Sequence, residues 1–534
     1  MKPFDTTGAF QPPTGADGLR RRAVRGAGVT VLSQGLAFAV QLIATMVLAR
    51  ILAPADFGVV TMATTFSILL ISCGHVGFPD AVLQRDDVDH SLASNLFWIN
   101  VGIGVFLTLV LASAGSLLAR FYGDARVAHI AVGVSLSIFF DSTSVLHLAL
   151  LKRAMRFALV SANDIVARMG SVAVSTVMGC TGCGYWALVG GVVAYPLFIT
   201  IGAWTKCRWI PSLPKRVPGT GSVVRFAAHV FARYSVGYFT QNTDNLLVGW
   251  RFGPVALGLY KKAYDLFVLP FSLLTVYPVA VSTLSRLNHD RAQYKRYVLG
   301  GLTVLALVGM GIGANLTLAG KDLVRLMLGP QWEAAGRIFT LFGPGIGLML
   351  IYSTNGMIHL SIGTTGRFFR WGIVESVVTI LLFLLTLRWG PQGIAAAWTA
   401  SYCILIVPAF WYAGKPIQLG VGSVLSVIWR CILASLLAGC ASAAILRALP
   451  ALVAFPGALG AFVRIVATSL VFGILYVGAV ILLHGGCAPL YKLFGLLREM
   501  LPVGKAKKPS QVDGTLSAPD SLAALAPTAS QELS

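Results

Sequence analysis

The chain has 534 residues, of which 56% are apolar and only 11% are charged. Soluble globular proteins average about 25% charged residues, so this composition excludes a soluble globule. The formal net charge is +21. No basic and aromatic array accompanies it, which argues against a nucleic-acid partner. The charge is better explained by membrane topology and by attraction to anionic lipid head groups.

Apolar windows of roughly 20 residues recur along almost the whole chain, and each is long enough to cross about 30 Å of hydrocarbon as a helix. The sequence therefore predicts an all-α polytopic membrane protein with about fourteen transmembrane helices. The predicted spans are 29–49, 58–78, 95–115, 127–147, 161–180, 184–205, 226–249, 256–280, 298–320, 338–360, 369–387, 392–412, 424–446 and 463–484.

One turn signal occurs twice, two hundred residues apart: LARILAPADFG at 48–58 returns as VGWRFGPVALG at 248–258. In register, the copies share a proline and a glycine, as the pairs Pro54 with Pro254 and Gly58 with Gly258. Such residues punctuate hairpins between membrane helices, because proline fixes the backbone and glycine frees it. The repeat predicts a duplicated protein with two pseudo-symmetric lobes, although small-residue turns also recur by chance.

Lys and Arg gather near the N-terminus and in the loops after the fourth, sixth, eighth and tenth predicted spans. Because translocation of positive charge is resisted, these loops are predicted to be cytoplasmic. An even number of spans then places both termini in the cytoplasm. The first span lacks a small-residue cleavage site, so we interpret it as a retained helix rather than a signal peptide.

These patterns predict a division of the chain into six parts. They are a cytoplasmic N-terminal tail at 1–25, an N-lobe of helices 1–6 at 26–205, a cytoplasmic interlobe linker at 206–225, a C-lobe of helices 7–12 at 226–412, helices 13–14 at 413–490 and a cytoplasmic tail at 503–534. The last of these is rich in Ser, Ala, Pro and Thr and is expected to be disordered, because it has too little apolar surface to pack.

The eight cysteines are scattered through apolar sequence. Cys180 and Cys183 form a single CxxC near a turn predicted on the outer side, where a disulfide is conceivable. No second CxxC or nearby His pair completes a metal site. The sequence therefore predicts neither a metal nor a cofactor.

Ionisable residues inside the spans are informative, because each costs about 2.5–3.5 kcal/mol near the bilayer centre and tends to face a cavity or a partner. One face of the seventh span carries a polar stripe at helical spacing: Arg225, His229, Arg233, Thr240 or Gln241, and Asp244, with Asn242 and Asn245 beside it. Further charges are Lys261, Lys262 and Asp265 at the start of the eighth span, and Asp164 and Arg168 on the fifth. The stripe cannot face acyl chains, so it predicts a polar cavity.

Structural interpretations of the same residues stay open. Arg225 is equally well explained as a flank side chain that snorkels to the interface, and Asp164 with Arg168 as a buried pair that fixes helix packing. Arg233 and Asp244 lie deeper in the span, which favours a cavity-lining role. Guanidinium groups bind phosphate oxygens bidentately and amides suit sugar hydroxyls, so such a cavity fits a lipid pyrophosphate carrying an oligosaccharide.

Several stretches carry a resemblance to a known family: LGLYKKAYDLFVLPFSLLTVYPVAVSTLSRL at 257–287, LGPQWEAAGRIFTLFGPGIG at 328–347, TTGRFFRW at 364–371, LARILAPADFGVVTMATTF in the first lobe, AVLQRDDVDHSLASNLFWIN at 81–100 and ARFYGDARV at 119–127. They resemble the polysaccharide transporter family, Wzx and especially WzxC-like, of the MOP flippase superfamily. The resemblance extends over roughly residues 25–490.

The resemblance implies a MATE/MurJ-like fold of fourteen helices in two lobes, with a C-terminal helix pair. It also implies a flippase, not an enzyme, that moves undecaprenyl-pyrophosphate-linked oligosaccharide from the inner to the outer leaflet of the bacterial cytoplasmic (inner) membrane. The glycan would serve O-antigen, capsule or exopolysaccharide biosynthesis. The implied partners are this lipid-linked oligosaccharide, membrane lipids, and a polysaccharide polymerase with its export machinery.

Carried onto this sequence, the resemblance implies a cavity role for Arg233, Asp244 and Lys261, with Lys261 and Lys262 standing where the family often has an Asn-Arg pair. The full set of predicted cavity residues is Arg168, His229, Arg233, Gln241, Asn242, Asp244, Lys261 and Lys262. Asp164 and Asp244 are candidates for coupling to a proton or sodium gradient, and substrate-pulled transport stays open. Arg367 and Arg370 are predicted at the cytoplasmic entrance, where they meet phosphate or only hold topology.

Three other functions stay open at this point: a lipid II flippase of the MurJ type, a MATE-type multidrug antiporter, and a membrane glycosyltransferase or O-antigen polymerase. A multidrug exporter usually has twelve spans and a cavity for organic cations. An enzyme of this kind should carry a large hydrophilic loop with paired carboxylates. The longest predicted loops have about twenty residues, and the acidic cluster at 86–89 is too isolated to build an active site.

Overall fold

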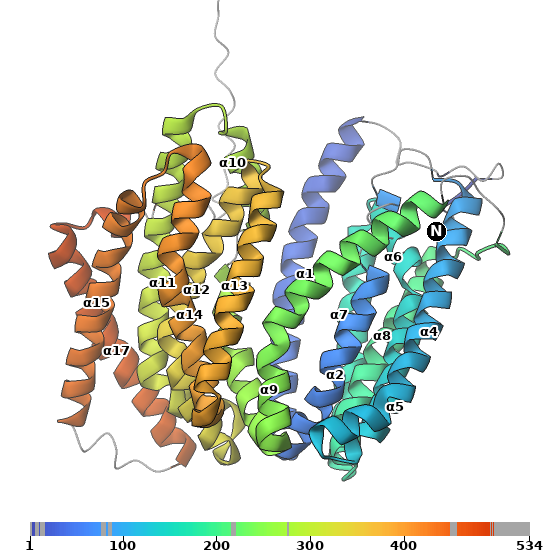
Figure 1. Cartoon of the computed structure of the whole chain (residues 1–534), viewed down its shortest axis with the longest axis horizontal. Helices are drawn as coiled ribbons and strands as arrows, with labels where there is room; N and C mark the ends of the chain where they lie inside the picture. The colour runs from blue at the N-terminus through green and yellow to red at the C-terminus, as the bar shows by residue number, and fades with distance from the viewer. Residues whose placement is uncertain are drawn as a thin grey trace, which may run out of the picture. The chain divides into compact units, whose positions relative to one another are not determined.

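The computed structural model describes residues 3–5, 10, 16–75, 79, 82–83, 88–214, 220–274, 277–448, 457–491, 493 and 495. The chain divides into two compact units, residues 1–489 and 490–534, and the fold described below is that of the first. Within its described residues nearly all regular structure is helical, with β geometry only in isolated bridges such as that between Phe4 and Phe10. The all-α prediction is confirmed (Figure 1).

The helices form two bundles. The first contains α1 (Ala16–Ile51), α2 (Pro54–His75), α4 (His90–Tyr122), α5 (Arg126–Ser142), α6 (Val145–Arg153), α7 (Phe157–Cys180) and α8 (Tyr185–Cys207). The second contains α9 (Thr220–Leu274), α10 (Tyr277–Arg286), α11 (Arg291–Leu328), α12 (Glu333–Ser361), α13 (Thr365–Thr386) and α14 (Gly390–Gly414). They are followed by the pair α15 (Val421–Arg447) and α17 (Gly457–His484).

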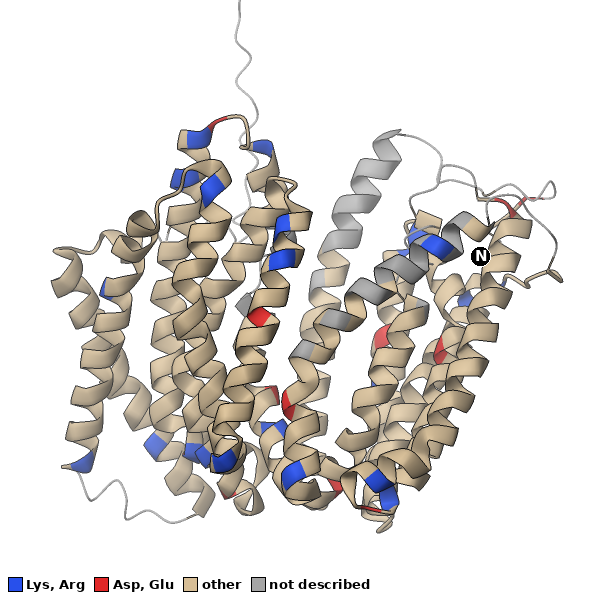
Figure 2. Ribbon diagram, in the orientation of Figure 1, with Lys and Arg blue, Asp and Glu red and all other residues tan. Residues whose placement is uncertain are grey.

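Eleven helical stretches among the described residues are long and apolar enough to cross a membrane. One of them, Thr365–Ile417, contains both α13 and α14, and α9 with its polar stripe is not among the eleven. Each of the fourteen predicted spans overlaps a helix named above, so a count of about fourteen is consistent with the structure. Figure 2 shows Lys and Arg gathered toward the ends of the helices, with a few Asp and Glu residues along their length.

A single backbone break divides α9. Gly253 has a φ of 77°, a conformation that L side chains rarely adopt. Tyr260 Oη lies 2.7 Å from Asp244 Oδ2, although a continuous helix would hold residues sixteen positions apart at about 24 Å. The chain therefore turns back at Gly253, and the seventh and eighth predicted spans are two helices joined there.

The two bundles meet through a reciprocal contact between the repeated turns. A Cβ atom on Gly58 would collide with the carbonyl oxygen of Pro254. With the roles exchanged, a Cβ atom on Gly258 would collide with the carbonyl oxygen of Pro54. The absence of a side chain lets the backbones approach this closely. These are the positions that the sequence repeat aligns, as two pseudo-symmetric lobes require.

Hydrogen bonds near the same turn join α1 to the connection between α11 and α12, which includes the 3-10 helix η1 (Pro330–Trp332). Trp332 Nε1 donates to the Ala49 carbonyl oxygen at 2.8 Å, and Gln331 Nε2 donates to the same oxygen. The rings of Phe57 and Trp332 meet edge to face with 5.3 Å between centroids. This end of the molecule is therefore closed by polar and aromatic contacts between the bundles.

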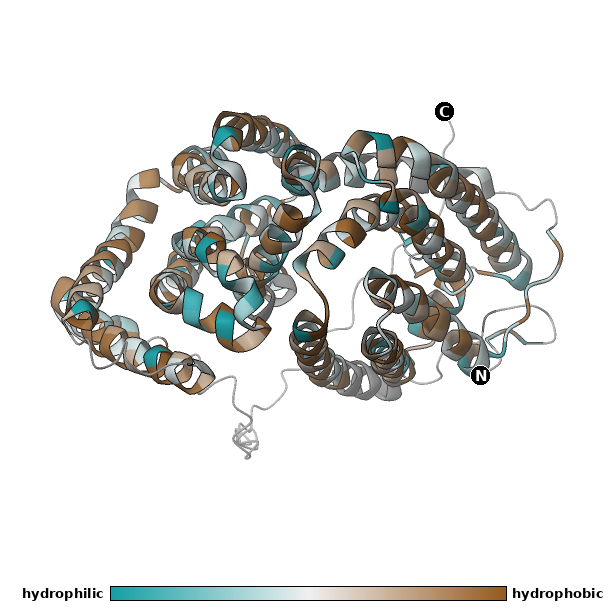
Figure 3. Ribbon diagram, turned by 90° about the horizontal axis from the view of Figure 1, so that it is seen from below, coloured by the Kyte–Doolittle hydropathy of each residue, from teal (hydrophilic) through white to brown (hydrophobic). Residues whose placement is uncertain are grey.

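The helices α15 and α17 pack on α11, at the edge of the second bundle (Figure 3). Tyr476 Oη donates to the Leu307 carbonyl oxygen at 2.7 Å, and Arg464 pairs with Asp322 through its Nε at 3.0 Å. Large apolar side chains on α17 remain exposed, namely Leu459, Phe462, Leu470, Ile474 and Leu482. Such a surface suits contact with lipid.

Some predicted features fall outside the described residues. The predicted tail at 503–534 is one of them, and so are Asp86 and Asp87 of the acidic cluster. The predicted linker at 206–225 contains the end of α8 and the beginning of α9, and its residues 215–219 are likewise outside. The predicted division into domains therefore stays a prediction.

Candidate substrate and ion site

Asp244, a charged residue of the polar stripe, is buried, with none of its surface exposed. Its Oδ2 accepts hydrogen bonds from Tyr260 Oη at 2.7 Å and from Trp398 Nε1 at 3.1 Å. Its Oδ1 accepts from the backbone N–H of Asn245 at 2.7 Å. A buried carboxylate is tolerated only when donors replace its water, and here α14 and both halves of α9 supply them.

Two amides lie beside this carboxylate. Asn242 Nδ2 donates to the Tyr238 carbonyl oxygen at 3.0 Å, and Asn245 Nδ2 donates to Asn242 Oδ1 at 3.3 Å. Asn245 Oδ1 is buried and accepts no hydrogen bond from the described residues. A buried acceptor without a donor, next to a carboxylate, is suited to a cation or a proton-bearing group.

Tyr238 links this polar face to the other bundle. Its Oη donates to the Thr65 carbonyl oxygen on α2 at 2.6 Å. Gln241, three residues further along α9, is exposed. His229 and Arg233 belong to the same helix, but their side chains lie outside the described residues. Their predicted cavity role stays a prediction, as does that of Gln241.

Lys261, Lys262 and Asp265 form a charged triad on the second half of α9. Lys261 Nζ lies 2.8 Å from Asp265 Oδ1, and Lys262 Nζ lies 3.6 Å from Asp265 Oδ2, so the contact predicted from the four-residue spacing is present. Lys262 Nζ also lies 4.4 Å from the ring centroid of Phe57 on α2. Two ammonium groups share the Asp265 carboxylate at the contact between the lobes, and the Asp244 carboxylate also interacts with Lys261.

Glu375 on α13 is a further acidic residue of the same bundle and was not among the predicted site residues. It interacts with Tyr352, whose Oη accepts from Trp371 Nε1 at 2.8 Å. The ring of Tyr402 lies 5.5 Å from that of Tyr352 and 6.0 Å from that of Trp398. Aromatic rings thus connect the Glu375 group with the Asp244 group. A lone Glu inside the predicted span 369–387 was the available signal.

The charged pair of the first bundle is separate from this cluster. Arg168 Nε donates to Asp164 Oδ2 at 2.9 Å, and Tyr195 Oη on α8 donates to Asp164 Oδ1 at 2.6 Å. The Arg168 guanidinium also lies 5.2 Å from the ring centroid of Tyr195. These contacts tie α7 to α8, while 34% of the Arg168 side chain stays exposed. The coupling role of Asp164 and the cavity role of Arg168 are untested by this geometry.

The two predicted entrance residues differ in their surroundings. Arg367 Nη2 donates to the Tyr412 carbonyl oxygen at 2.7 Å, and its guanidinium carbon lies 4.2 Å from the Tyr412 ring centroid. Arg367 therefore fastens the beginning of α13 to the end of α14. Arg370, one turn later, is exposed. Of the two arginines, only Arg370 therefore has an exposed side chain.

No group of three or more His, Cys, Asp or Glu residues is arranged to hold a metal ion in the part of the chain that the structure describes. Cys180 and Cys183 are both exposed and are not joined by a disulfide. The oxygens around Asp244 are of the type that small cations take as ligands.

The arrangement of two helical bundles defines the fold class of this protein, an all-α polytopic membrane fold of the MurJ and MATE type. The chain is similar to the lipid II flippase MurJ in its inward closed conformation, with a TM-score of 0.67 and 15% identity over 85% of this chain and 98% of that one. It is also similar to an inward-facing multidrug resistance MATE family transporter, with a TM-score of 0.56 and 12% identity over 72% and 94%. These likenesses concern the fold alone.

Comparison of the sequence assigns the chain to one protein family. The family described as polysaccharide biosynthesis protein matches residues 47–336, more than half of the chain, and the chain belongs to that family. The predicted membership among polysaccharide transporters of the MOP superfamily is confirmed.

Three relatives have named roles. The succinoglycan biosynthesis transport protein ExoT of Rhizobium meliloti is 21% identical over 67% of this chain and 73% of its own length. The teichuronic acid biosynthesis protein TuaB of Bacillus subtilis is 24% identical, over 63% and 70%. The lipopolysaccharide biosynthesis protein WzxC of Escherichia coli is 21% identical, over 59% and 65%.

Proposed function

We propose that this protein is a flippase that moves an undecaprenyl-pyrophosphate-linked oligosaccharide from the inner to the outer leaflet of the bacterial cytoplasmic membrane. Three findings support the proposal: membership of the polysaccharide biosynthesis protein family, relatives named for polysaccharide transport and synthesis, and the fold shared with a lipid II flippase. The single observation that carries it is the pair of ammonium groups of Lys261 and Lys262, held beside Asp265 at the contact between the lobes.

In this proposal the diphosphate head group lies beside Lys261 and Lys262 while the lipid tail stays in the bilayer. Ammonium groups attract phosphate oxygens as point charges, and they gain strength where water is partly excluded. Gln241 and Asn242, on the half of α9 that precedes Gly253, offer amides to sugar hydroxyls. Arg233 would add a bidentate phosphate contact. No bond in the substrate has to form or break.

The cycle that we propose exchanges access by rocking the lobes. The closed end contains the repeated turns, which the charge distribution predicts to be extracytoplasmic. Releasing the head group on that side requires Trp332 and Gln331 to leave the Ala49 carbonyl oxygen and Gly58 to separate from Pro254. Binding energy from the substrate, an ion, or both would have to favour that opened state.

We propose Asp244 as the residue that couples transport to a proton or sodium ion. Its carboxylate already has three donors, so a cation would have to displace Tyr260 or Trp398 or use the free Asn245 Oδ1. Asp244→Asn keeps the shape and removes the charge. We expect it to abolish any dependence of transport on the ion gradient, whereas an unchanged dependence contradicts the assignment.

The test of the proposed function combines genetics with a reconstituted assay. A strain deleted for this gene is complemented with the wild type, with Lys261→Gln/Lys262→Gln, or with Lys295→Gln as a control on α11. We expect the double variant to lose most surface glycan and to fail to move a fluorescent lipid-pyrophosphate oligosaccharide in proteoliposomes. Wild-type glycan and flipping rates for a correctly inserted double variant would reject the proposal.

The same strain separates the other functions. A lipid II flippase would be needed for growth and cell-wall integrity, and a multidrug antiporter would change sensitivity to organic cations. A glycosyltransferase or polymerase would alter glycan length or composition in a cell extract that has no membrane barrier. Loss of surface glycan with normal growth, normal drug sensitivity and accumulated lipid-linked repeat units is the result that we expect.

A further inference from the structure

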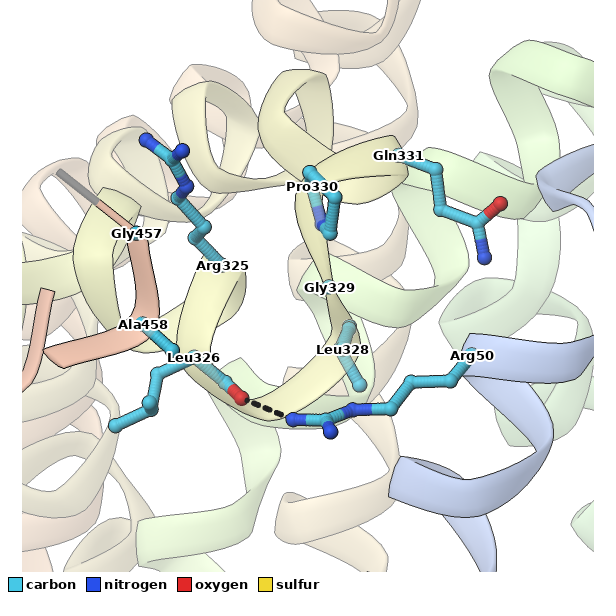
Figure 4. A pocket seen from close by; sticks show the side chains of 9 residues that line it. All are labelled: Arg50, Arg325, Leu326, Leu328, Gly329, Pro330, Gln331, Gly457 and Ala458. Atoms are coloured by element: carbon cyan, nitrogen blue, oxygen red, sulfur yellow. Dashed lines mark hydrogen bonds between the residues drawn. The ribbon is translucent and has the colours of Figure 1, made fainter.

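A pocket of about 440 Å³ lies where α1, the end of α11 and the beginning of α17 meet, on the closed side of the lobe contact. The residues that line it are Arg50, Arg325, Leu326, Leu328, Gly329, Pro330, Gln331, Gly457 and Ala458. Figure 4 shows Arg50 reaching from α1 to the Leu326 carbonyl oxygen, a hydrogen bond of 2.9 Å. The volume falls in the range of about 300–1,000 Å³ that small-molecule sites occupy.

The charge of the pocket lining is positive and uncompensated. Neither Arg50 nor Arg325 has an ion-pair partner within 4.0 Å among the described residues. The nearby carboxylates are already engaged: Asp322 with Arg464, and Glu333 with Arg337. Figure 4 shows Arg50 on the α1 side of the lining and Arg325 on the opposite side, near Gly457 of α17. The lining contains no carboxylate, so its charge favours an anion.

Uncharged N–H donors in the lining also favour an anion. The first N–H groups of a helix have no partner within the helix, and α17, which has 28 residues, begins at Gly457 in this lining. Its first turn contains no acidic residue. Arg50 uses only Nη2 for Leu326, which leaves most of its five donors available. A planar guanidinium fork matches the oxygens of a phosphate group better than a halide.

We propose that this pocket binds a phosphate-bearing anion and that the bound anion fastens α1 to α11 and α17. It is a second site, separate from the triad of Lys261, Lys262 and Asp265, and it does not depend on which substrate the protein carries. Because the pocket joins elements of both bundles, its occupation stabilises the closed end of the molecule. The phosphate belongs either to a lipid head group or to a soluble phosphate or diphosphate.

Thermal unfolding of the purified full chain tests the proposal through its tryptophan fluorescence. The protein is placed in phosphatidylcholine nanodiscs, with sodium pyrophosphate added against sodium chloride of equal ionic strength. A second series replaces a third of the lipid by phosphatidylglycerol. The variants are Arg325→Gln, which keeps the Arg50 to Leu326 bond, and the double variant Arg50→Gln/Arg325→Gln. Arg337→Gln, an exposed arginine outside the pocket, is the control.

We expect at least one of the two phosphate sources to raise the Tm of the wild type and of Arg337→Gln. Binding to Arg325→Gln should weaken about tenfold or more, as the loss of one charge-assisted contact implies, so that its Tm shift disappears at the same concentration. A shift with phosphatidylglycerol alone identifies a lipid head group, and a shift with pyrophosphate alone a soluble phosphate. If neither source raises the Tm, or if the shift survives in both pocket variants, the proposal is wrong.

Discussion

Gly58 and Pro254 touch through backbone atoms across the two bundles, and Gly258 and Pro54 make the same contact with the roles exchanged. Each pair combines one residue from each copy of the repeated turn. The contact requires the absence of a side chain at both glycines, because a Cβ atom would occupy the place of a carbonyl oxygen. The two copies of the repeated turn therefore contact each other and form part of the interface between the lobes.

The first prediction concerns this contact. Gly58→Ala should prevent the close approach and destabilise the closed state by about 1–3 kcal/mol, the usual cost of overpacking. Cysteine-accessibility labelling near the turn should increase and the Tm should fall. Gly372→Ala on α13 is the matched control, because nothing lies within 4 Å of an added Cβ there. Equal effects of the two substitutions would contradict the interpretation.

The second prediction concerns the donors to Asp244. Trp398→Phe removes the indole N–H and leaves the buried carboxylate one hydrogen bond short, which should cost about 1–3 kcal/mol of stability. The double variant Trp398→Phe/Asp244→Asn should lose less free energy of unfolding than the two single variants lose together, because the charge that needs the indole donor is gone. Thermal unfolding of the wild type, the two single variants and the double variant gives the coupling energy between the two residues. Trp411→Phe, on the same helix and 57% exposed, should leave the Tm nearly unchanged.

The third prediction distinguishes packing from ion coupling in the first bundle. Asp164 and Arg168 are about one third exposed, so a purely structural pair should contribute no more than about 1 kcal/mol in a double-mutant cycle. Asp164→Asn should then keep the dependence of transport on the ion gradient. Loss of that dependence in Asp164→Asn, together with its survival in Asp244→Asn, would move the coupling role to Asp164.

The fourth prediction concerns pH and the turn between α4 and α5. The Arg126 guanidinium, 2.8 Å from Asp124, lowers the pKa of that carboxyl below its ordinary value of 3.8. A carboxyl with a lowered folded-state pKa stabilises the fold above its unfolded pKa, and this stabilisation fades as pH falls from about 4 toward the folded value. Asp124→Asn should therefore lower the Tm at pH 7 and have little effect at the lowest pH. A difference that is the same at every pH would exclude this ion pair as the cause.

The sequence by itself determined the class of fold and the local pairs. Hydrocarbon leaves backbone polar groups no partner outside a helix, so long apolar windows specify where helices lie. Contacts within one helix follow from spacing alone, as for Lys261 with Asp265 and Asp164 with Arg168, because residues four apart share a face. The repeated turn likewise indicated duplication before any contact was known.

Only the tertiary structure decided which distant groups meet. Trp398 donates a hydrogen bond to Asp244 from 154 residues away. Glu375 lies beside Tyr352 of the same aromatic cluster, and no local sequence pattern specifies which helices bring these residues together. The pocket between α1, α11 and α17 brings Arg50 beside residues near 325 and 457. Helix packing in a membrane depends on shape and on a few hydrogen bonds rather than on hydrophobic periodicity, since both faces of a helix are apolar. For that reason the sequence indicated the helices, and their packing produced the sites.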